Sequence, residues 1–215
     1  MNPSLIIFDC DGVLVDSEPI ASRIFHELVT EIGLNISLEE TVRRFEGLSD
    51  QDSIRIIEEK LRRPVPGSFM ENHDKRLFEA LSRELEPIQN ISAALERISI
   101  PICVASSGPY AKIRLSLGVT QLLPKFEGRI FSATDVSRGK PFPDLFLHAA
   151  EKMGVPSKNC IVVEDSVYGV QAGVAAGMAV LGYAERTDPE ILRKAGATVF
   201  DDMLNLPELI KKSID

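Results

Sequence analysis

The sequence predicts an α/β protein, with a Rossmann-like, doubly wound parallel sheet into which an all-helical domain is inserted. Short continuous apolar runs recur along the chain, and helical periodicity separates them. One long region near the N-terminus shows helical periodicity alone. Continuous apolar runs are typical of parallel strands buried on both faces, and the helices between them cover those faces.

The first expected strand covers residues 4–9. Five later apolar runs are expected to form strands at residues 100–105, 130–132, 160–163, 178–182 and 198–200. Helical patterns separate or follow these runs at residues 110–117, 142–153, 167–176, 188–195 and 204–212. Right-handed crossovers should arrange the strands in one sheet.

The region between the first two strands contains no convincing strand. It opens with helix-start chemistry, because Ser17 offers a capping hydroxyl and Pro19 suits a first turn. Glycine and proline residues then divide it into about four helices. We therefore expect a core domain at residues 1–16 and 87–215 and a helical domain at residues 17–86.

The composition is that of a soluble globular protein, with 44% hydrophobic and 26% charged residues among 215. No apolar stretch approaches the roughly 18 residues that a membrane span needs. The N-terminal apolar run has no basic segment before it, so we interpret it as a strand and not a signal peptide. A net charge of −8 argues against a nucleic-acid partner. The three cysteines lack metal-ligand spacing and are expected to be buried free thiols in a cytoplasmic protein.

Reactive side chains follow several of the expected strands. In open parallel sheets, ligands bind beyond the carboxyl ends of the strands, so these side chains should converge on one edge. They are Asp9 and Asp11 after the first strand, Ser106 and Ser107 after the second, Lys140 before a later helix, and Glu164 and Asp165 after the fourth.

This set of side chains predicts phosphoryl chemistry. A carboxylate can attack phosphorus, and Mg²⁺ can neutralise clustered carboxylates while it binds a phosphoryl oxygen. Hydroxyl and backbone N–H groups can hold the remaining oxygens, and a lysine can offset developing charge. A second carboxylic acid can protonate the leaving oxygen and then activate water.

Four segments resemble the motifs of the haloacid dehalogenase superfamily. They begin at Asp9 (Asp-x-Asp-Gly-Val-Leu-Val-Asp-Ser-Glu), Ala105 (Ala-Ser-Ser-Gly), Gly139 (Gly-Lys-Pro-x-Pro-Asp) and Val163 (Val-Glu-Asp-Ser). The helical insert resembles the cap of the β-phosphoglucomutase-like subgroup. Within it, the chain is most similar to the branch of 6-phosphogluconate and sugar-alcohol phosphatases.

The resemblance implies a role for each motif residue. Asp9 would be the nucleophile and a Mg²⁺ ligand, and Asp11 the general acid/base that also gives a backbone carbonyl to the metal. Ser106 and the Ser107 amide would bind the phosphoryl group, and Lys140 would offset its charge. Asp165, with Glu164 beside it, would complete the metal site. The resemblance leaves open whether the peptide bond after Lys140 is cis.

The cap loop bears on the choice of reaction. In this family the loop around Glu46, Gly47, Ser49 and Asp50 selects the substrate, and here it is acidic where the mutases carry basic residues. Ala21 also replaces a histidine of the mutases. The resemblance therefore implies a Mg²⁺-dependent phosphatase for a small sugar, sugar-acid or sugar-alcohol phosphate, with an aspartyl-phosphate intermediate and a phosphomutase as the alternative.

Two non-enzymatic alternatives carry less weight. A phospho-receiver domain also combines Mg²⁺, a serine and a lysine, but it has no cap and carries its phosphorylated aspartate on a later strand. A silent scaffold is disfavoured because no motif residue is missing. We expect a monomer, since a cap of this kind must be able to move.

Overall fold

The computed structural model describes residues 3–45 and 47–212, and the chain forms two compact units. The first unit, the core, consists of residues 1–16 and 86–215, and the second, the cap, of residues 17–85. The two segments that lead out of the core and back pair with each other. Within the core, the Asp16 N–H donates to the Glu86 carbonyl at 3.0 Å.

Six parallel strands form the core sheet, in the order β3-β2-β1-β4-β5-β6. They are β1 (Leu5–Phe8), β2 (Ile102–Ser106), β3 (Ile130–Ser132), β4 (Cys160–Glu164), β5 (Ala179–Tyr183) and β6 (Thr198–Phe200). The order reverses between β1 and β4, which is where doubly wound sheets bind ligands. The predicted Rossmann-like fold class is confirmed.

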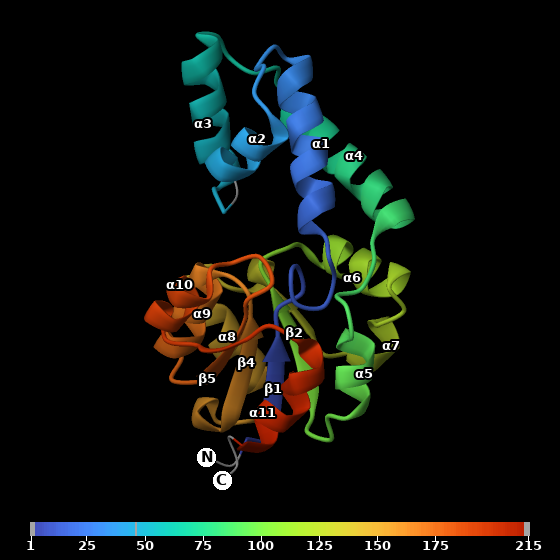
Figure 1. Cartoon of the computed structure of the whole chain (residues 1–215), viewed down its shortest axis with the longest axis vertical. Helices are drawn as coiled ribbons and strands as arrows, with labels where there is room; N and C mark the ends of the chain where they lie inside the picture. Colours follow the sequence, from blue (N-terminus) through green and yellow to red (C-terminus); the bar gives the residue numbers. More distant parts are fainter. Residues whose placement is uncertain (1–2, 46, 213–215) are drawn as a thin grey trace. The chain divides into compact units, whose positions relative to one another are not determined.

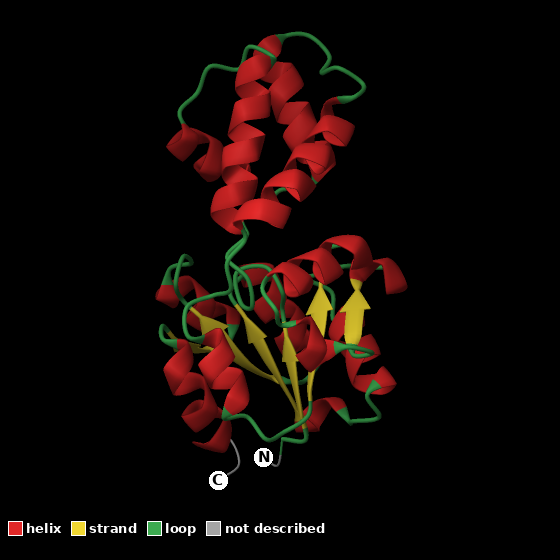
Figure 2. Ribbon diagram, turned by 90° about the vertical axis from the view of Figure 1, so that its right-hand side faces the viewer, coloured by secondary structure: helices red, strands yellow, loops and turns green. Residues whose placement is uncertain are grey.

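Helices cover both faces of this sheet (Figures 1 and 2). One face carries α8 (Asp144–Lys152), α9 (Val167–Ala175) and α10 (Pro189–Ala195). The other carries α5 (Ile91–Glu96), α6 (Tyr110–Val119), α7 (Leu123–Phe126) and α11 (Leu206–Lys212). Short 3₁₀ helices occur at Ala133–Asp135, Ser157–Asn159 and Met203–Asn205. Among the described residues, no helix has the length and apolar character that crossing a membrane requires.

Alternation along β1 explains the two-layered core. Leu5 and Ile7 are fully buried in a cluster with residues of α8 and α9. Phe8 points to the opposite face, where its ring meets Phe126 of α7 edge-on at 6.2 Å between centroids. Because a strand turns successive side chains to opposite faces, an apolar run buries both surfaces of the sheet.

Two helices of the core were not predicted. Both α5 and α7 are short, with 6 and 4 residues, so neither spans enough turns to give a helical period. The predicted strands are otherwise found within two residues of their expected starts.

The cap consists of α1 (Glu18–Glu31), α2 (Leu38–Phe45), α3 (Asp50–Leu61) and α4 (Phe69–Glu84). The rings of Phe45 and Phe69 pack against Phe25 of α1, at 5.1 and 6.0 Å between centroids. α1 begins where predicted, with proline in its first turn, but the Ser17 side chain makes no capping hydrogen bond. This part of the prediction was wrong, because the backbone of Ser17 is already in the right-handed helical region, with φ −86° and ψ −21°, whereas a capping serine usually has an extended backbone.

Candidate active site

The carboxyl ends of β1 and β4 lie side by side where the strand order reverses. Phe8 pairs in register with Val163, and the Asp9 N–H continues the ladder by donating to the Val163 carbonyl at 3.0 Å. Asp9 and Glu164 therefore leave the two strands next to each other. Oxygens of Asp9, Glu164 and Asp165 lie within 4.8 Å of one another.

Lys140 reaches this cluster from the segment before α8. Its Nζ donates to Asp9 Oδ1 and to Glu164 Oε1, each at 2.6 Å, and only 6% of its side chain is exposed. The ammonium also lies 5.0 Å from the centre of the Phe146 ring. Among the described residues, nothing donates a hydrogen bond to Asp9 Oδ2. The second oxygen of Asp9 is thus left for a cation or a phosphorus atom.

Glu164 ties the cluster to the start of α9. It is fully buried, and its Oε2 accepts from the Asp165 N–H, the Ser166 N–H and the Ser166 hydroxyl, each at 2.9 Å. Ser166 in turn caps α9 by accepting from the Gly169 N–H at 3.0 Å. Glu164 therefore fixes Lys140, the Asp165 backbone and the first turn of α9 relative to one another.

Gly12 allows the side chain of Asp165 to approach the loop that follows β1. A Cβ at Gly12 would lie 2.0 Å from Asp165 Oδ2, and its φ of +75° is one that residues with a side chain rarely adopt. The glycine of the Asp-x-Asp-Gly motif has no Cβ to fill this space. It leaves room for the carboxylate that completes the acidic cluster.

Burial dominates the electrostatics of Asp9. It raises the pKa of this carboxyl to about 7, with Glu164 and Asp11 adding to the rise and Lys140 opposing it. The nearby carboxylates raise the pKa of Lys140 despite its burial, so the lysine stays charged. One ammonium thus faces three clustered carboxyl groups.

This cluster fits a hard divalent cation. The donors are oxygens only, as Mg²⁺ prefers, and a second positive charge would favour the ionised form of Asp9, whose pKa is raised mainly by burial and further by the neighbouring carboxylates. The Asp11 carboxylate is not one of the three clustered groups, which suits a residue expected to offer its carbonyl and not its side chain.

Ser106 is the last residue of β2, and Ser107 follows it, so both lie at the carboxyl edge of the sheet. Ser106 is buried, and its Oγ accepts from the Gly108 N–H at 3.1 Å. The hydroxyl of Ser132, at the end of β3, donates to the Gly108 carbonyl at 2.7 Å and so fixes the loop after β2. No described residue accepts a hydrogen bond from the Ser106 hydroxyl, so this group can donate one to an anion.

Asp11 is paired with a lysine that the sequence did not single out. Lys112 lies in the first turn of α6, and its Nζ is 2.9 Å from Asp11 Oδ2. Lys140 and Lys112 therefore bind different members of the Asp-x-Asp pair. The sequence likewise assigned no role in the site to Ser166, the last residue of the fourth motif, or to Gly169.

The predicted specificity residues lie in the cap around the start of α3. Gly47 has a φ of +76°, and Ser49 caps the helix by accepting from the Asp52 N–H at 3.1 Å. Asp50 is the first residue of α3 and is exposed. Glu46 lies outside the described residues.

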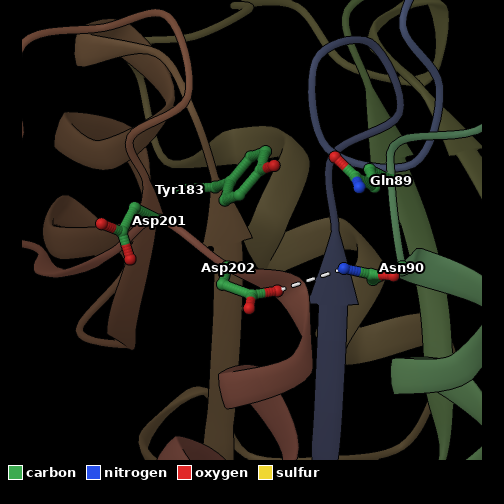
Figure 3. A pocket seen from close by; sticks show the side chains of 5 residues that line it. All are labelled: Gln89, Asn90, Tyr183, Asp201 and Asp202. Atoms are coloured by element: carbon green, nitrogen blue, oxygen red, sulfur yellow. Dashed lines mark hydrogen bonds between the residues drawn. The ribbon is translucent and has the colours of Figure 1, made fainter.

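A polar hollow lies elsewhere on the core and holds none of the predicted catalytic side chains. Its volume is about 360 Å³. Figure 3 shows the Asn90 amide pointing to Asp202 across it, with 3.4 Å between Nδ2 and Oδ1. Its lining comprises Gln89, Asn90, Tyr183, Asp201 and Asp202.

The three thiols should be unreactive in the folded protein. All are buried, and burial, helped by Asp11 and Asp9, raises the pKa of Cys10 well above its usual value. Burial also raises the pKa of Cys160 to about 11. We expect iodoacetamide at neutral pH to label no cysteine of the native protein and all three in denaturant, as mass spectrometry would measure. Rapid native labelling of Cys10 would contradict this burial.

The sequence matches the family described as haloacid dehalogenase-like hydrolase over residues 6–183. The 6-phosphogluconate phosphatase of Escherichia coli (strain K12) is 37% identical over 210 residues, covering 96% of this chain and 94% of that protein.

Two solved structures share the whole fold. A haloacid dehalogenase-like protein of unknown function from Agrobacterium tumefaciens has a TM-score of 0.89 and 39% identity, with 100% of both chains covered. A hydrolase of the same family from Deinococcus radiodurans, solved with bound phosphate and sodium, has a TM-score of 0.82 and 27% identity, covering 99% of this chain and 97% of that one. The predicted resemblance is confirmed: this chain belongs to the haloacid dehalogenase-like hydrolase family.

Proposed function

We propose that the protein is a Mg²⁺-dependent phosphatase for a small phosphorylated sugar, sugar acid or sugar alcohol. The observation that carries this proposal is the pairing of Asp9 with Lys140 inside a cluster of three carboxylates. Lys140 binds one oxygen of Asp9, and the other has no donor among the described residues. Such a carboxylate is oriented and ready to attack.

The reaction would proceed in two displacements. In the first, Asp9 Oδ2 forms a bond to phosphorus while the bond from phosphorus to the leaving oxygen breaks, and Asp11 gives that oxygen a proton. In the second, water attacks phosphorus, its proton passes to Asp11, and the bond to Asp9 breaks to release phosphate. The Ser106 hydroxyl and the Ser107 amide would hold the phosphoryl oxygens, and Lys140 would offset their charge.

We assign the proposed metal to Asp9, Asp165 and the Asp11 carbonyl, with Glu164 beside them. When bound, Mg²⁺ would neutralise the carboxylates and polarise a phosphoryl oxygen. Four hydrogen bonds already engage the Glu164 carboxylate, from Lys140, the Asp165 and Ser166 amides and the Ser166 hydroxyl. In the proposal Glu164 therefore mainly fixes its neighbours, and it would meet the metal through water.

The similarity to a 6-phosphogluconate phosphatase supports a sugar-acid phosphate as the substrate class. A cap cation could then recognise the carboxylate. Arg23 pairs with Glu84 within the cap, and Arg44 pairs with Glu40. Arg43 is exposed and forms no ion pair with any described residue, so we propose it for this contact. Gly47, Ser49 and Asp50 remain proposed specificity residues.

A panel of phosphorylated metabolites tests the function. We expect release of inorganic phosphate that depends on Mg²⁺, is abolished by EDTA, and is fastest with 6-phosphogluconate or related sugar-acid and sugar-alcohol phosphates. Conversion of β-glucose 1-phosphate to glucose 6-phosphate without phosphate release would instead support the phosphomutase. Absence of turnover with the whole panel and with p-nitrophenyl phosphate would contradict the enzyme.

We also propose that the protein acts as a monomer in the cytoplasm. The three buried free thiols support a reducing compartment. Light scattering coupled to gel filtration would test the monomer, which has an expected mass of 23.7 kDa.

A further inference from the structure

Lys112 binds the carboxylate that the proposed mechanism uses to move protons. Its Nζ lies 2.9 Å from Asp11 Oδ2, and the two side chains are each only 20% exposed. An ion pair in this partly shielded position is held more firmly than one on the open surface. The partners are 101 positions apart in the sequence, so the contact ties α6 to the loop after β1.

The stem of Lys112 runs beside the proposed phosphate-binding loop. A Cβ placed on Gly108 would lie 3.5 Å from Lys112 Cδ and 3.6 Å from Ser106 Oγ, which means that both groups border the same glycine. Ser132 fixes Gly108 through its carbonyl at 2.7 Å. The side chain of Lys112 thus runs from the loop at Gly108 to Asp11, and its contact with this loop helps to fix where its ammonium group lies.

Two lysines divide the carboxylates of the site. Lys140 binds Asp9 and Glu164, whereas Lys112 binds Asp11. The clustered carboxylates are those of Asp9, Glu164 and Asp165, and the Asp11 side chain is not among them. We propose that Lys112 is a positioning residue that keeps the Asp11 carboxylate beside the phosphate-binding loop and apart from the metal ligands. This inference rests on the proposed phosphatase function.

Loss of this positioning should lower kcat/KM for an alkyl phosphate and kcat for p-nitrophenyl phosphate, but not kcat/KM for p-nitrophenyl phosphate. With an alkyl phosphate, the leaving oxygen needs a proton, so kcat/KM depends on Asp11. With p-nitrophenyl phosphate, the leaving group departs as a stable anion, so kcat/KM does not need that proton. The later attack of water still needs Asp11, so kcat for p-nitrophenyl phosphate should fall.

The test is Lys112→Met, which keeps an unbranched stem over Gly108 and removes the charge. We expect kcat/KM for the best alkyl phosphate of the panel to fall by about 10- to 100-fold. We expect kcat for p-nitrophenyl phosphate to fall as well, with a pre-steady-state burst of p-nitrophenolate, while its kcat/KM changes by less than about threefold. Lys112→Arg keeps the charge and should restore most of the lost activity.

A double-mutant cycle decides whether Lys112 acts through Asp11. In an Asp11→Asn background, Lys112→Met should have little further effect on the residual rates, because the carboxylate that Lys112 is proposed to position is already absent. An equal loss in every rate constant, an undiminished loss in the Asp11→Asn background, or no loss at all would overturn the inference. These outcomes require a wild-type protein that turns over p-nitrophenyl phosphate, so they are distinct from failure of the phosphatase proposal. Thermal denaturation of each variant checks folding, and Lys112→Arg carries the test if Lys112→Met unfolds.

Discussion

Asp9→Asn is expected to lower kcat for every phosphorylated substrate by roughly 10⁴-fold or more, because the variant lacks the attacking oxygen. The change keeps the size of the side chain and one acceptor for Lys140, whose Nζ is 2.6 Å from Asp9 Oδ1 in the native protein. The fold should therefore survive. Steady-state kinetics with Mg²⁺ and a circular dichroism spectrum measure the two effects.

Asp201→Asn is the matched control for that variant. Asp201 is exposed in the polar hollow of the core and lies outside the candidate site. The same chemical change there should leave kcat within about twofold of the wild type, because substitutions of exposed residues outside an active site usually have small effects. If Asp9→Asn retained near-native kcat, Asp9 would not be the nucleophile.

Gly169→Ala is expected to lower activity strongly, although Gly169 lies in α9, a helix that carries none of the proposed reactive groups. A Cβ at this position would lie 1.7 Å from Glu164 Oε1, so the buried carboxylate must move. Lys140 binds that same oxygen at 2.6 Å, so Asp9 would lose its fixed partner as well. We expect kcat to fall by roughly 100-fold and stability to fall by about 1–3 kcal/mol. Enzyme kinetics and urea denaturation measure these changes.

Gly118→Ala provides the matched control, since it places the same methyl group in another helix. Gly118 lies in α6, and a Cβ there would have no atom of the described residues within 4 Å apart from its chain neighbours and the backbone of its own helix. Alanine should stabilise that helix by up to about 1 kcal/mol and leave turnover unchanged. A Gly169→Ala variant as stable and active as Gly118→Ala would show that Glu164 does not need its observed position.

The sequence predicted the sheet because burial leaves a direct mark on composition. Residues 161–163 of β4 are buried on both faces of the sheet and must therefore be apolar, and this requirement is local. The same logic placed Asp9 and Glu164 at the ends of two strands, and the observed sheet order shows that these strands are neighbours. Short helices such as α5 and α7 leave no comparable mark, since they span fewer than two full turns.

Site residues that act through distant partners could not be predicted in this way. A lysine in the first turn of a helix is ordinarily solvated, and the sequence around Lys112 contains no pattern that indicates a contact with Asp11. The spacing of Gly169, Gly173 and Gly177 in the sequence is typical of a helix that packs closely on a sheet, and it does not point to a carboxylate. Only the three-dimensional arrangement shows that its missing side chain is replaced by the Glu164 carboxylate.

The central claim is that Asp9 becomes phosphorylated during turnover. Rapid acid quench of the wild-type protein with Mg²⁺ and p-nitrophenyl phosphate, followed by peptide mass spectrometry, tests it most directly. We expect the added mass of one phosphoryl group on the peptide that carries Asp9, and no such mass in Asp9→Asn. Continued Mg²⁺-dependent turnover with no phosphorylated Asp9 at any quench time would contradict it, since water would then attack the substrate directly.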